Sequence, residues 1–225
     1  PEETDITSAY LIAVCGQQHE ALVYKSPQKN PISILPLPHS VFSCISIPSD
    51  DGTLTNVVFG TRHLAFTLPS SLFATATYFD LVRDSPEAYG GSVFALPKHD
   101  EGWIRSLAHT PTFLYGTTYY QKDPHDPVGI GLYRWRLTQS ASSELVVSGP
   151  VRAVAARGSD VFYYLDDVVY ILSDTSPKPI PLGTFGKGRN ITSLLVTATI
   201  LAAGNDKGAL TLLDVHNKRV INNLS

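Results

Sequence analysis

The feature that most constrains the fold is a repeated pair of short, β-rich runs separated by a polar turn. In "ILAAGNDKGALTLL" (200–213), an apolar run, a turn that begins at Gly204 and a second apolar run follow one another. The stretch "LIAVCGQQHEALVY" (11–24) has the same spacing, with Gly16 in the place of Gly204. Runs rich in Val, Ile, Thr, Tyr and Phe that are bounded by Gly, Asn and Asp are typical of β-hairpins. The two stretches therefore predict two copies of one hairpin unit.

Three further copies give the hairpin a regular period. "NVVFGTRHLAFTL" (56–68) keeps the glycine, "VFYYLDDVVYILSD" (161–174) replaces it with an acidic turn, and the copy that starts with "TFLYG" (112–116) has an expanded turn. The equivalent positions 16, 60, 116, 164 and 204 lie 44, 56, 48 and 40 residues apart. This spacing is close to the about 40–50 residues of one β-propeller blade.

An apolar run follows each hairpin and another precedes all but the first, which predicts four short strands per unit. Three of the following runs contain proline, which lacks the N–H group that a central strand must donate and is therefore tolerated mainly on sheet edges. The outermost strand of a blade is such an edge. We therefore expect an all-β chain, a single β-propeller domain of about five four-stranded blades or part of a larger propeller. The predicted blades span approximately 1–38, 39–97, 102–149, 150–185 and 190–225.

The longest repeat contains an insertion, residues 70–91. Its first part, "SSLFATATYFDLVRD" (70–84), is compatible with a helix or with an additional strand, and its end reads "SPEAYGG". Because loops that interrupt a regular scaffold often carry binding residues, we expect this insertion to be a chain-specific contact element. We also expect its deletion to leave folding intact.

The two ends of the repeat array leave ring closure open. Only ten residues precede the first hairpin, and the last predicted strand ends with the chain. A propeller commonly closes by sharing strands from both termini in one blade, which removes exposed edges. Three arrangements remain possible: a self-closed five-blade ring, a fragment of a larger ring, and a ring that a partner protein completes.

The stretch "LAAGNDKGALTLLDV" (201–215) resembles the end of a WD-repeat unit. It has the pattern Gly-x-Asp-x-Gly in the turn and an aspartate that closes the following strand. The resemblance is clear in residues 191–225 and implies a structural role for Gly204, Asp206 and Asp214. In particular, it implies that Asp206 helps to hold neighbouring strands together.

Bulk charge and hydropathy exclude several classes of partner. The formal net charge is −3 and the isoelectric point is near 6.2, so the chain lacks the basic surface that nucleic acid binding requires. No apolar stretch approaches the about 20 residues of a membrane-spanning helix. Cys15 and Cys44 are the two cysteines, which favours an intracellular location, cytoplasmic or nuclear. The glycosylation motifs at Asn190 and Asn223 are short enough to arise by chance.

The predicted inner strands contain no Asp or Glu, so they do not supply the pair of carboxylates that glycoside hydrolysis requires. The seven histidines form no cluster at metal-ligand spacing, and "DPHDP" (123–127) is explained as a rigid, proline-containing loop. We therefore expect no catalytic residue, no metal and no cofactor.

The predicted function is a non-enzymatic scaffold, a WD-repeat-like subunit of an intracellular multiprotein complex whose partners are other proteins. A carbohydrate-binding or carbohydrate-cleaving five-bladed propeller is the alternative. Exposed turns and the insertion supply the candidate partner-binding residues. These are His19, His63, Asp166, Lys207 and Tyr89.

Overall fold

A computed structural model describes residues 10–15, 20–25, 29–31, 33–37, 40–48, 55–75, 85–97, 102–123, 126–184 and 190–224. These residues form five antiparallel sheets, one of three strands and four of four strands, in which strands follow one another in chain order. The predicted all-β fold is confirmed. Each sheet is called a blade here and is numbered in chain order.

Blade 1 has strands β1 (Tyr10–Cys15), β2 (Glu20–Lys25) and β3 (Ser33–Pro36). Blade 2 has β4 (Ser43–Pro48), β5 (Thr55–Gly60), β6 (Leu64–Pro69) and β7 (Val93–Ala95). Blade 3 has β8 (Trp103–His109), β9 (Phe113–Asp123), β10 (Asp126–Arg136) and β11 (Gln139–Ser148). Blade 4 has β12 (Ala153–Arg157), β13 (Asp160–Leu165), β14 (Val168–Ser173) and β15 (Ser176–Thr184). Blade 5 has β16 (Ile191–Val196), β17 (Ile200–Asn205), β18 (Leu210–Asp214) and β19 (Arg219–Leu224).

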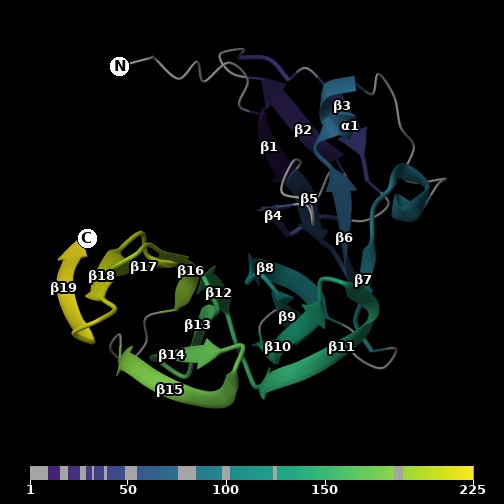
Figure 1. The fold of residues 1–225 in the computed structure, drawn as a ribbon. Coiled ribbons are helices and arrows are strands. Elements are labelled where there is room, and N and C mark those ends of the chain that lie inside the picture. The colour runs from purple at the N-terminus through teal and green to yellow at the C-terminus, as the bar shows by residue number, and fades with distance from the viewer. Residues whose placement is uncertain are drawn as a thin grey trace, which may run out of the picture.

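The blades stand side by side around an open arc, with blade 1 and blade 5 at its two ends (Figure 1). The first strands of blades 2 to 5 lie toward the inside of the arc, where β8 contacts β4 and β12, and β12 contacts β16. The last strands, β15 and β19 among them, lie on the outside. Prolines occur in the outer strands β3 and β15, where a missing N–H group costs no ladder hydrogen bond.

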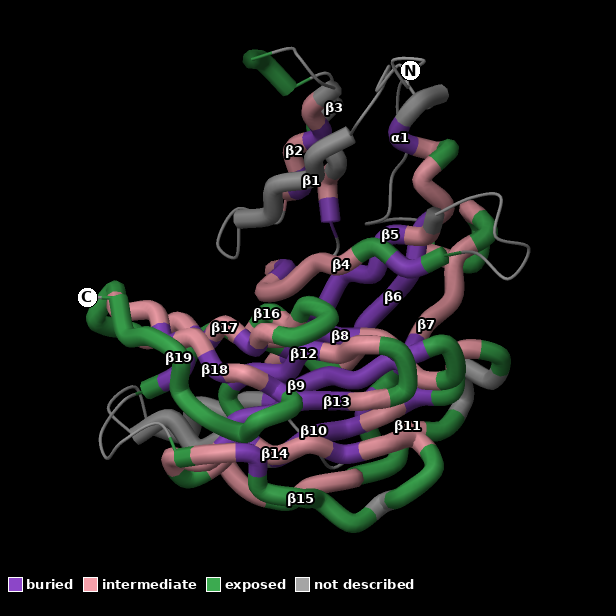
Figure 2. The backbone as a smooth tube through the Cα atoms, turned by 60° about the vertical axis from the view of Figure 1, so that its left-hand side comes forward, coloured by how far each residue is buried: buried purple, intermediate pink, exposed green. Residues whose placement is uncertain are grey.

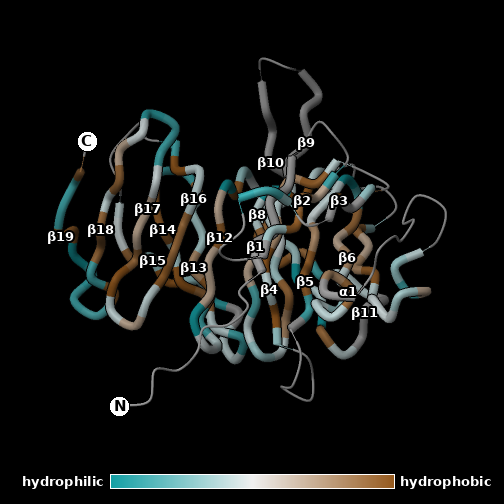
Figure 3. The backbone as a smooth tube through the Cα atoms, turned by 90° about the horizontal axis from the view of Figure 1, so that it is seen from above, coloured by the Kyte–Doolittle hydropathy of each residue, from teal (hydrophilic) through white to brown (hydrophobic). Residues whose placement is uncertain are grey.

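Apolar side chains fill the spaces between successive blades. Successive residues of a strand point to opposite faces, so a central blade with two neighbours needs apolar residues at almost every position. In β13, Val161 and Tyr163 pack toward blade 3, whereas Phe162 and Tyr164 pack toward blade 5. Figure 2 shows the resulting band of buried residues through the middle strands of blades 2 to 4. In Figure 3 the apolar residues follow the strands and the hydrophilic ones gather in the turns.

Trp135 illustrates how two blades are joined. Its side chain is fully buried in blade 3, and its indole Nε1 donates a hydrogen bond of 2.9 Å to the carbonyl oxygen of Ala95 in blade 2. Burial of an indole is favourable when its N–H group finds such an acceptor. The contact therefore combines packing with a directional bond across the blade interface.

The insertion after β6 is tied into the core. Its described parts contain a short helix, α1 (Ser71–Thr75), and a 3₁₀ turn (Pro86–Tyr89), while residues 76–84 lie outside the described part. Phe73 is buried in the cluster between blades 1 and 2, and its ring lies 6.5 Å from that of Phe59. Deletion of residues 70–91 would remove this core side chain, so we now expect the deletion to lower stability rather than to leave it unchanged. Among the described residues, no helix has the length and apolar character needed to cross a membrane.

Candidate functional site

One end of the blades gathers the turns between the second and third strands together with the segments that lead into the inner strands. The backbone N–H of His63 donates to the carbonyl of Gly102, just before β8, at 2.9 Å. The N–H of Asp206 donates to the carbonyl of Asn190, just before β16, at 3.1 Å. We call this end the turn face.

The β13–β14 turn of blade 4 has a tightly defined shape. Asp166 and Asp167 both have positive φ, 50° and 64°, as the two central residues of a type I′ hairpin turn require. Aspartate tolerates this conformation better than most residues with a side chain. The Tyr164 hydroxyl donates a 2.8 Å hydrogen bond to Oδ1 of Asp167. Burial, together with this hydrogen bond, raises the pKa of Tyr164 above its ordinary value.

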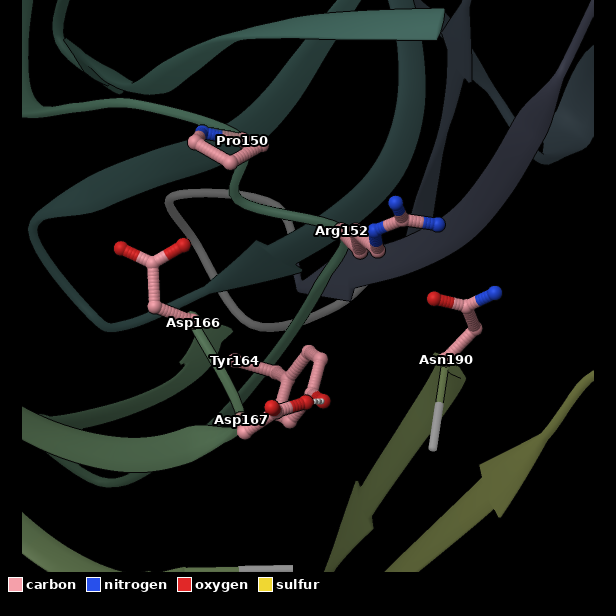
Figure 4. Close-up of a pocket in the computed structure, with 6 residues that line it drawn as sticks. All are labelled: Pro150, Arg152, Tyr164, Asp166, Asp167 and Asn190. Carbon is pink, nitrogen blue, oxygen red and sulfur yellow. Dashed lines mark hydrogen bonds between the residues drawn. The ribbon is translucent and has the colours of Figure 1, made fainter. Parts of the chain in front are cut away.

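A shallow cavity of about 180 Å³ opens beside this turn, where blade 4 meets its neighbours. Figure 4 shows the carboxylate of Asp166 pointing away from the Tyr164–Asp167 pair, while the guanidinium of Arg152 extends toward the side of Asn190. The cavity thus carries both signs of charge at its rim. Its lining residues are Pro150, Arg152, Tyr164, Asp166, Asp167 and Asn190.

A hydrogen bond connects this cavity to the turn of blade 5. Nδ2 of Asn190 donates to Oδ2 of Asp206 at 2.8 Å. Lys207 follows in the same turn, and its backbone N–H donates to Oδ1 of Asn205 at 3.0 Å while its side chain is exposed. Asp206 therefore holds the β17–β18 turn against the segment that precedes β16, and Lys207 is the next, exposed residue of that turn.

Gly204 and Asp214 lie within the blade 5 sheet. A Cβ atom at Gly204 would approach Oγ of Ser193 to 2.6 Å, so a larger residue would displace that hydroxyl. Asp214 accepts hydrogen bonds from the backbone N–H groups of His216 and Asn217, both at 2.9 Å. The hydrogen bonds from Asn217 and His216 lower the pKa of the Asp214 carboxyl. Both residues act on the local strand and turn geometry.

The structure brings together some of the predicted contact residues and separates others. Asp166 lines the cavity and Lys207 lies in the neighbouring turn of blade 5, whereas His63, exposed and with a φ of 69°, belongs to the turn of blade 2. Tyr89 follows β6, which runs away from the turn face, and therefore lies toward the opposite end of blade 2. His19 lies outside the described residues.

Sequence reasoning missed Arg152, Tyr164 and Asn190. Asn190 was noted only as the start of a glycosylation motif, and the other two lie in apolar runs that read as strands. The pairing of β12 with β13 brings Arg152 beside the turn that carries Asp166, and the packing of blade 4 against blade 5 adds Asn190 to the same cavity. No local sequence pattern could have identified that grouping.

Metal-ligand clusters and the Cys44 thiol were two further candidates for reactivity among the described residues. Within these ranges, no group of three or more His, Cys, Asp or Glu side chains could hold a metal ion. Burial raises the pKa of the Cys44 thiol to about 12, which keeps it in the unreactive protonated form near neutral pH. Of the "DPHDP" loop, Asp123 and Asp126 pair at the tip of the β9–β10 hairpin, and residues 124–125 lie outside the described part.

No family model matches the sequence, and no curated protein matches it. Solved structures do match. The WD40 beta propeller domain of Doa1 aligns with a TM-score of 0.59 and 11% identity over 96% of this chain. A chain of the mitotic checkpoint complex aligns with a TM-score of 0.57 and 14% identity, again over 96% of this chain. This chain spans 64% and 59%, respectively, of the length of those two chains. Together with the five stacked sheets, these likenesses show that the chain has the fold of a WD40-type β-propeller.

Proposed function

We propose that the chain is a non-enzymatic protein-interaction scaffold of an intracellular multiprotein complex, and that the cavity on the turn face is a contact site for a protein partner. The observation that carries this proposal is the convergence of Arg152, Asp166 and Asn190 around one opening at a blade junction. These side chains come from three separate connections that the stacked blades hold in place. A rigid frame that presents loop residues is a common basis for protein binding.

The character of the cavity favours a polypeptide segment as its ligand. The guanidinium and the carboxylates can pair with charged side chains, and the amide of Asn190 can exchange hydrogen bonds with a peptide backbone. Lys207, an exposed charge in the turn of blade 5, is a further candidate contact residue. The assembly named in one structural match is a multiprotein complex, which supports the same class of function for a chain of this fold.

The proposal is tested by reversing one charge at the cavity. Asp166→Arg and Arg152→Glu are introduced separately into the tagged full-length chain, which is then purified from its native cells under mild conditions. We expect each change to remove the same set of co-purifying proteins, as quantified by mass spectrometry. Lys178→Asp, an exposed charge reversal on the outer strand β15, is the matched control and should retain that set.

A circular dichroism spectrum and an unfolding curve for each variant show whether the fold is kept. Asp166 and Arg152 are exposed, so neither change removes a core contact. If both folded variants retain every partner of the wild-type chain, the cavity is not the contact site. If the wild-type chain itself co-purifies with no protein, the scaffold function is wrong.

A further inference from the structure

The cavity on the turn face carries opposite charges that do not neutralise each other. Among the described residues, none forms a hydrogen bond or an ion pair with the carboxylate of Asp166 or with the guanidinium of Arg152. Figure 4 shows the two groups directed to different sides of the cavity, with the Arg152 side chain extending toward Asn190. Both charges are therefore available to a ligand that brings the complementary ones.

The backbone fixes the positions from which these two charges project. Asp166 belongs to the type I′ turn of blade 4 and has a φ of 50°. The backbone N–H of Arg152 donates to the carbonyl oxygen of Tyr164 at 3.2 Å, just before the inner strand β12 begins. A ligand therefore meets charged groups on a backbone that is already ordered, which reduces the entropy lost on binding.

The rest of the lining adds hydrogen-bond acceptors. The Tyr164 hydroxyl donates to Oδ1 of Asp167 at 2.8 Å, and a carboxylate has about four lone-pair sites, so Asp167 can accept further hydrogen bonds. Nδ2 of Asn190 donates to Asp206, and Figure 4 shows Oδ1 of Asn190 on the side that faces the two cavity aspartates. Acceptor groups therefore surround a single cationic group, the guanidinium of Arg152.

These groups specify the charges of a ligand. A lysine or arginine side chain supplies donors for Asp166 and Asp167, whereas Arg152 pairs best with a carboxylate. A segment with acidic side chains alone is repelled by the two aspartates, and a segment with basic side chains alone is repelled by Arg152. The volume of about 180 Å³ is below the about 300–1,000 Å³ of typical small-molecule pockets, so the cavity suits one side chain of a longer segment.

We propose that the cavity binds an extended peptide segment in which a lysine or arginine lies beside an aspartate or glutamate. The basic side chain binds at Asp166 and Asp167, and the acidic side chain pairs with Arg152. Oδ1 of Asn190 accepts a hydrogen bond from the peptide backbone. This inference rests on the proposed function for the existence of a protein partner, and it deepens that function by naming the segment that is recognised.

The test uses the proteins whose capture depends on both Asp166 and Arg152. Overlapping synthetic peptides that cover their sequences are labelled, and their affinity for the purified full-length chain is measured by fluorescence polarisation. We expect the peptides that bind to contain a basic residue beside an acidic one. Replacing that basic residue by glutamine should weaken binding by about tenfold, because it removes hydrogen bonds between charged groups.

Two variants of the chain assign this effect to the cavity. Asp166→Asn removes the charge, and asparagine tolerates the positive φ of the turn, so binding should weaken about tenfold while the circular dichroism spectrum is kept. Asp166→Lys should bind the peptide whose basic residue is replaced by glutamate more tightly than the wild-type chain does. Lys178→Asp, on the outer strand β15, is the control and should bind like the wild-type chain.

The outcomes separate this inference from the scaffold function. Binding peptides that lack a basic residue, or that bind Asp166→Asn as tightly as the wild-type chain, would overturn the inference while leaving the cavity as a protein contact site. Failure of Asp166→Lys to prefer the glutamate peptide would overturn it as well. An empty set of cavity-dependent proteins would instead contradict the proposed function, and the inference with it.

Discussion

Among the described residues, blade 4 lies between two neighbouring blades, whereas blade 5 is packed against a described blade on one face. The opposite face of blade 5, which carries Leu195 and Leu212, is called the free face here. Both have four antiparallel strands joined in the same order. Strand β13 of blade 4 is buried on both faces, and the aromatic rings of Tyr163 and Tyr170 stack within the blade at 5.3 Å. In blade 5, every residue of β19 is exposed, as Figure 2 shows.

The comparison teaches that an apolar residue in this repeat contributes to stability only if a neighbouring blade covers it. The sequence "ILAAG" of β17 alternates buried and half-buried residues, although all five are apolar or small. Hydrophobic stabilisation follows the area that is removed from water, not the identity of the residue. Equivalent positions in blades 4 and 5 should therefore differ in energetic weight.

The largest expected effect is the loss of an aromatic ring between the two blades. Phe162→Ala removes a fully buried side chain and leaves a cavity, which should lower the free energy of unfolding by about 3–5 kcal/mol. Urea denaturation followed by circular dichroism measures this loss. Leu195→Ala on the free face is the control and should change stability by at most about 0.5 kcal/mol in the isolated chain. Equal losses of unfolding free energy for the two variants would contradict the expected difference between covered and exposed positions.

Two adjacent leucines of β18 test the same difference between a covered and an uncovered face within blade 5. Leu213 is 1% exposed and packs toward blade 4, whereas Leu212 points to the free face. Leu213→Ala should cost about 2–5 kcal/mol, because it deletes buried methyl groups and leaves a cavity. Leu212→Ala should cost less than half as much. Chemical denaturation of both variants at one pH provides the test, and a larger loss for Leu212→Ala would show that its face is covered in solution.

A hydrogen bond joins blade 3 to blade 4 and has a smaller expected effect. The Tyr115 hydroxyl donates to Oδ1 of Asp174 at 2.7 Å. Tyr115→Phe should lower stability by about 1.5–3 kcal/mol, the usual range for a hydrogen bond to a charged group. Tyr170→Phe, which removes the hydroxyl of a half-buried tyrosine in blade 4, serves as the comparison variant.

The same bond predicts a dependence on high pH. Burial and the hydrogen bond with Asp174 raise the pKa of Tyr115. Its contribution is therefore complete below the unfolded tyrosine pKa of about 10 and declines as the pH rises through the folded value. Unfolding curves at pH 8 and pH 11 should show a smaller decline for Tyr115→Phe than for the wild-type chain. Parallel declines would show that this hydroxyl does not titrate differently on folding.

The smallest effect concerns the exposed turn after β18. Hydrogen bonds from Asn217 and His216 lower the pKa of Asp214, so its stabilising contribution is present above the unfolded aspartate pKa of about 3.9 and is lost as the pH falls through the folded value. Between pH 5 and pH 2, the unfolding midpoint of Asp214→Asn should fall slightly less than that of the wild-type chain. An unchanged acid profile would show that the turn does not depend on the charged form.

The repeat in the sequence was sufficient to predict the class of fold and the pairing of several strands. Glycine or acidic turns between β-rich runs define hairpins locally, and Asp166 with Asp167 is such a turn. Prolines in the predicted outer runs likewise indicated an edge, because a missing N–H group has the same consequence in any context. These signals depend on neighbouring residues alone, so the sequence contains them in full.

Other features of the structure could not be predicted from local sequence patterns. Phe73 looked like part of a separable insertion, yet it packs between blades 1 and 2. Arg152 and Asn190 carried no pattern that would associate them with Asp166. In both cases the decisive neighbours lie on other strands, and the residues meet only when those strands pack or pair.

The sequence by itself determined that the chain forms short antiparallel sheets with turns at a regular period, because hairpin geometry depends on the conformational preferences of consecutive residues. Only the tertiary structure decided which apolar faces are covered, which connections share a cavity, and which face of blade 5 packs against blade 4. The physical reason is that a residue becomes buried only when another blade packs against it. The residues of that blade lie elsewhere in the sequence, so the strand itself does not reveal them.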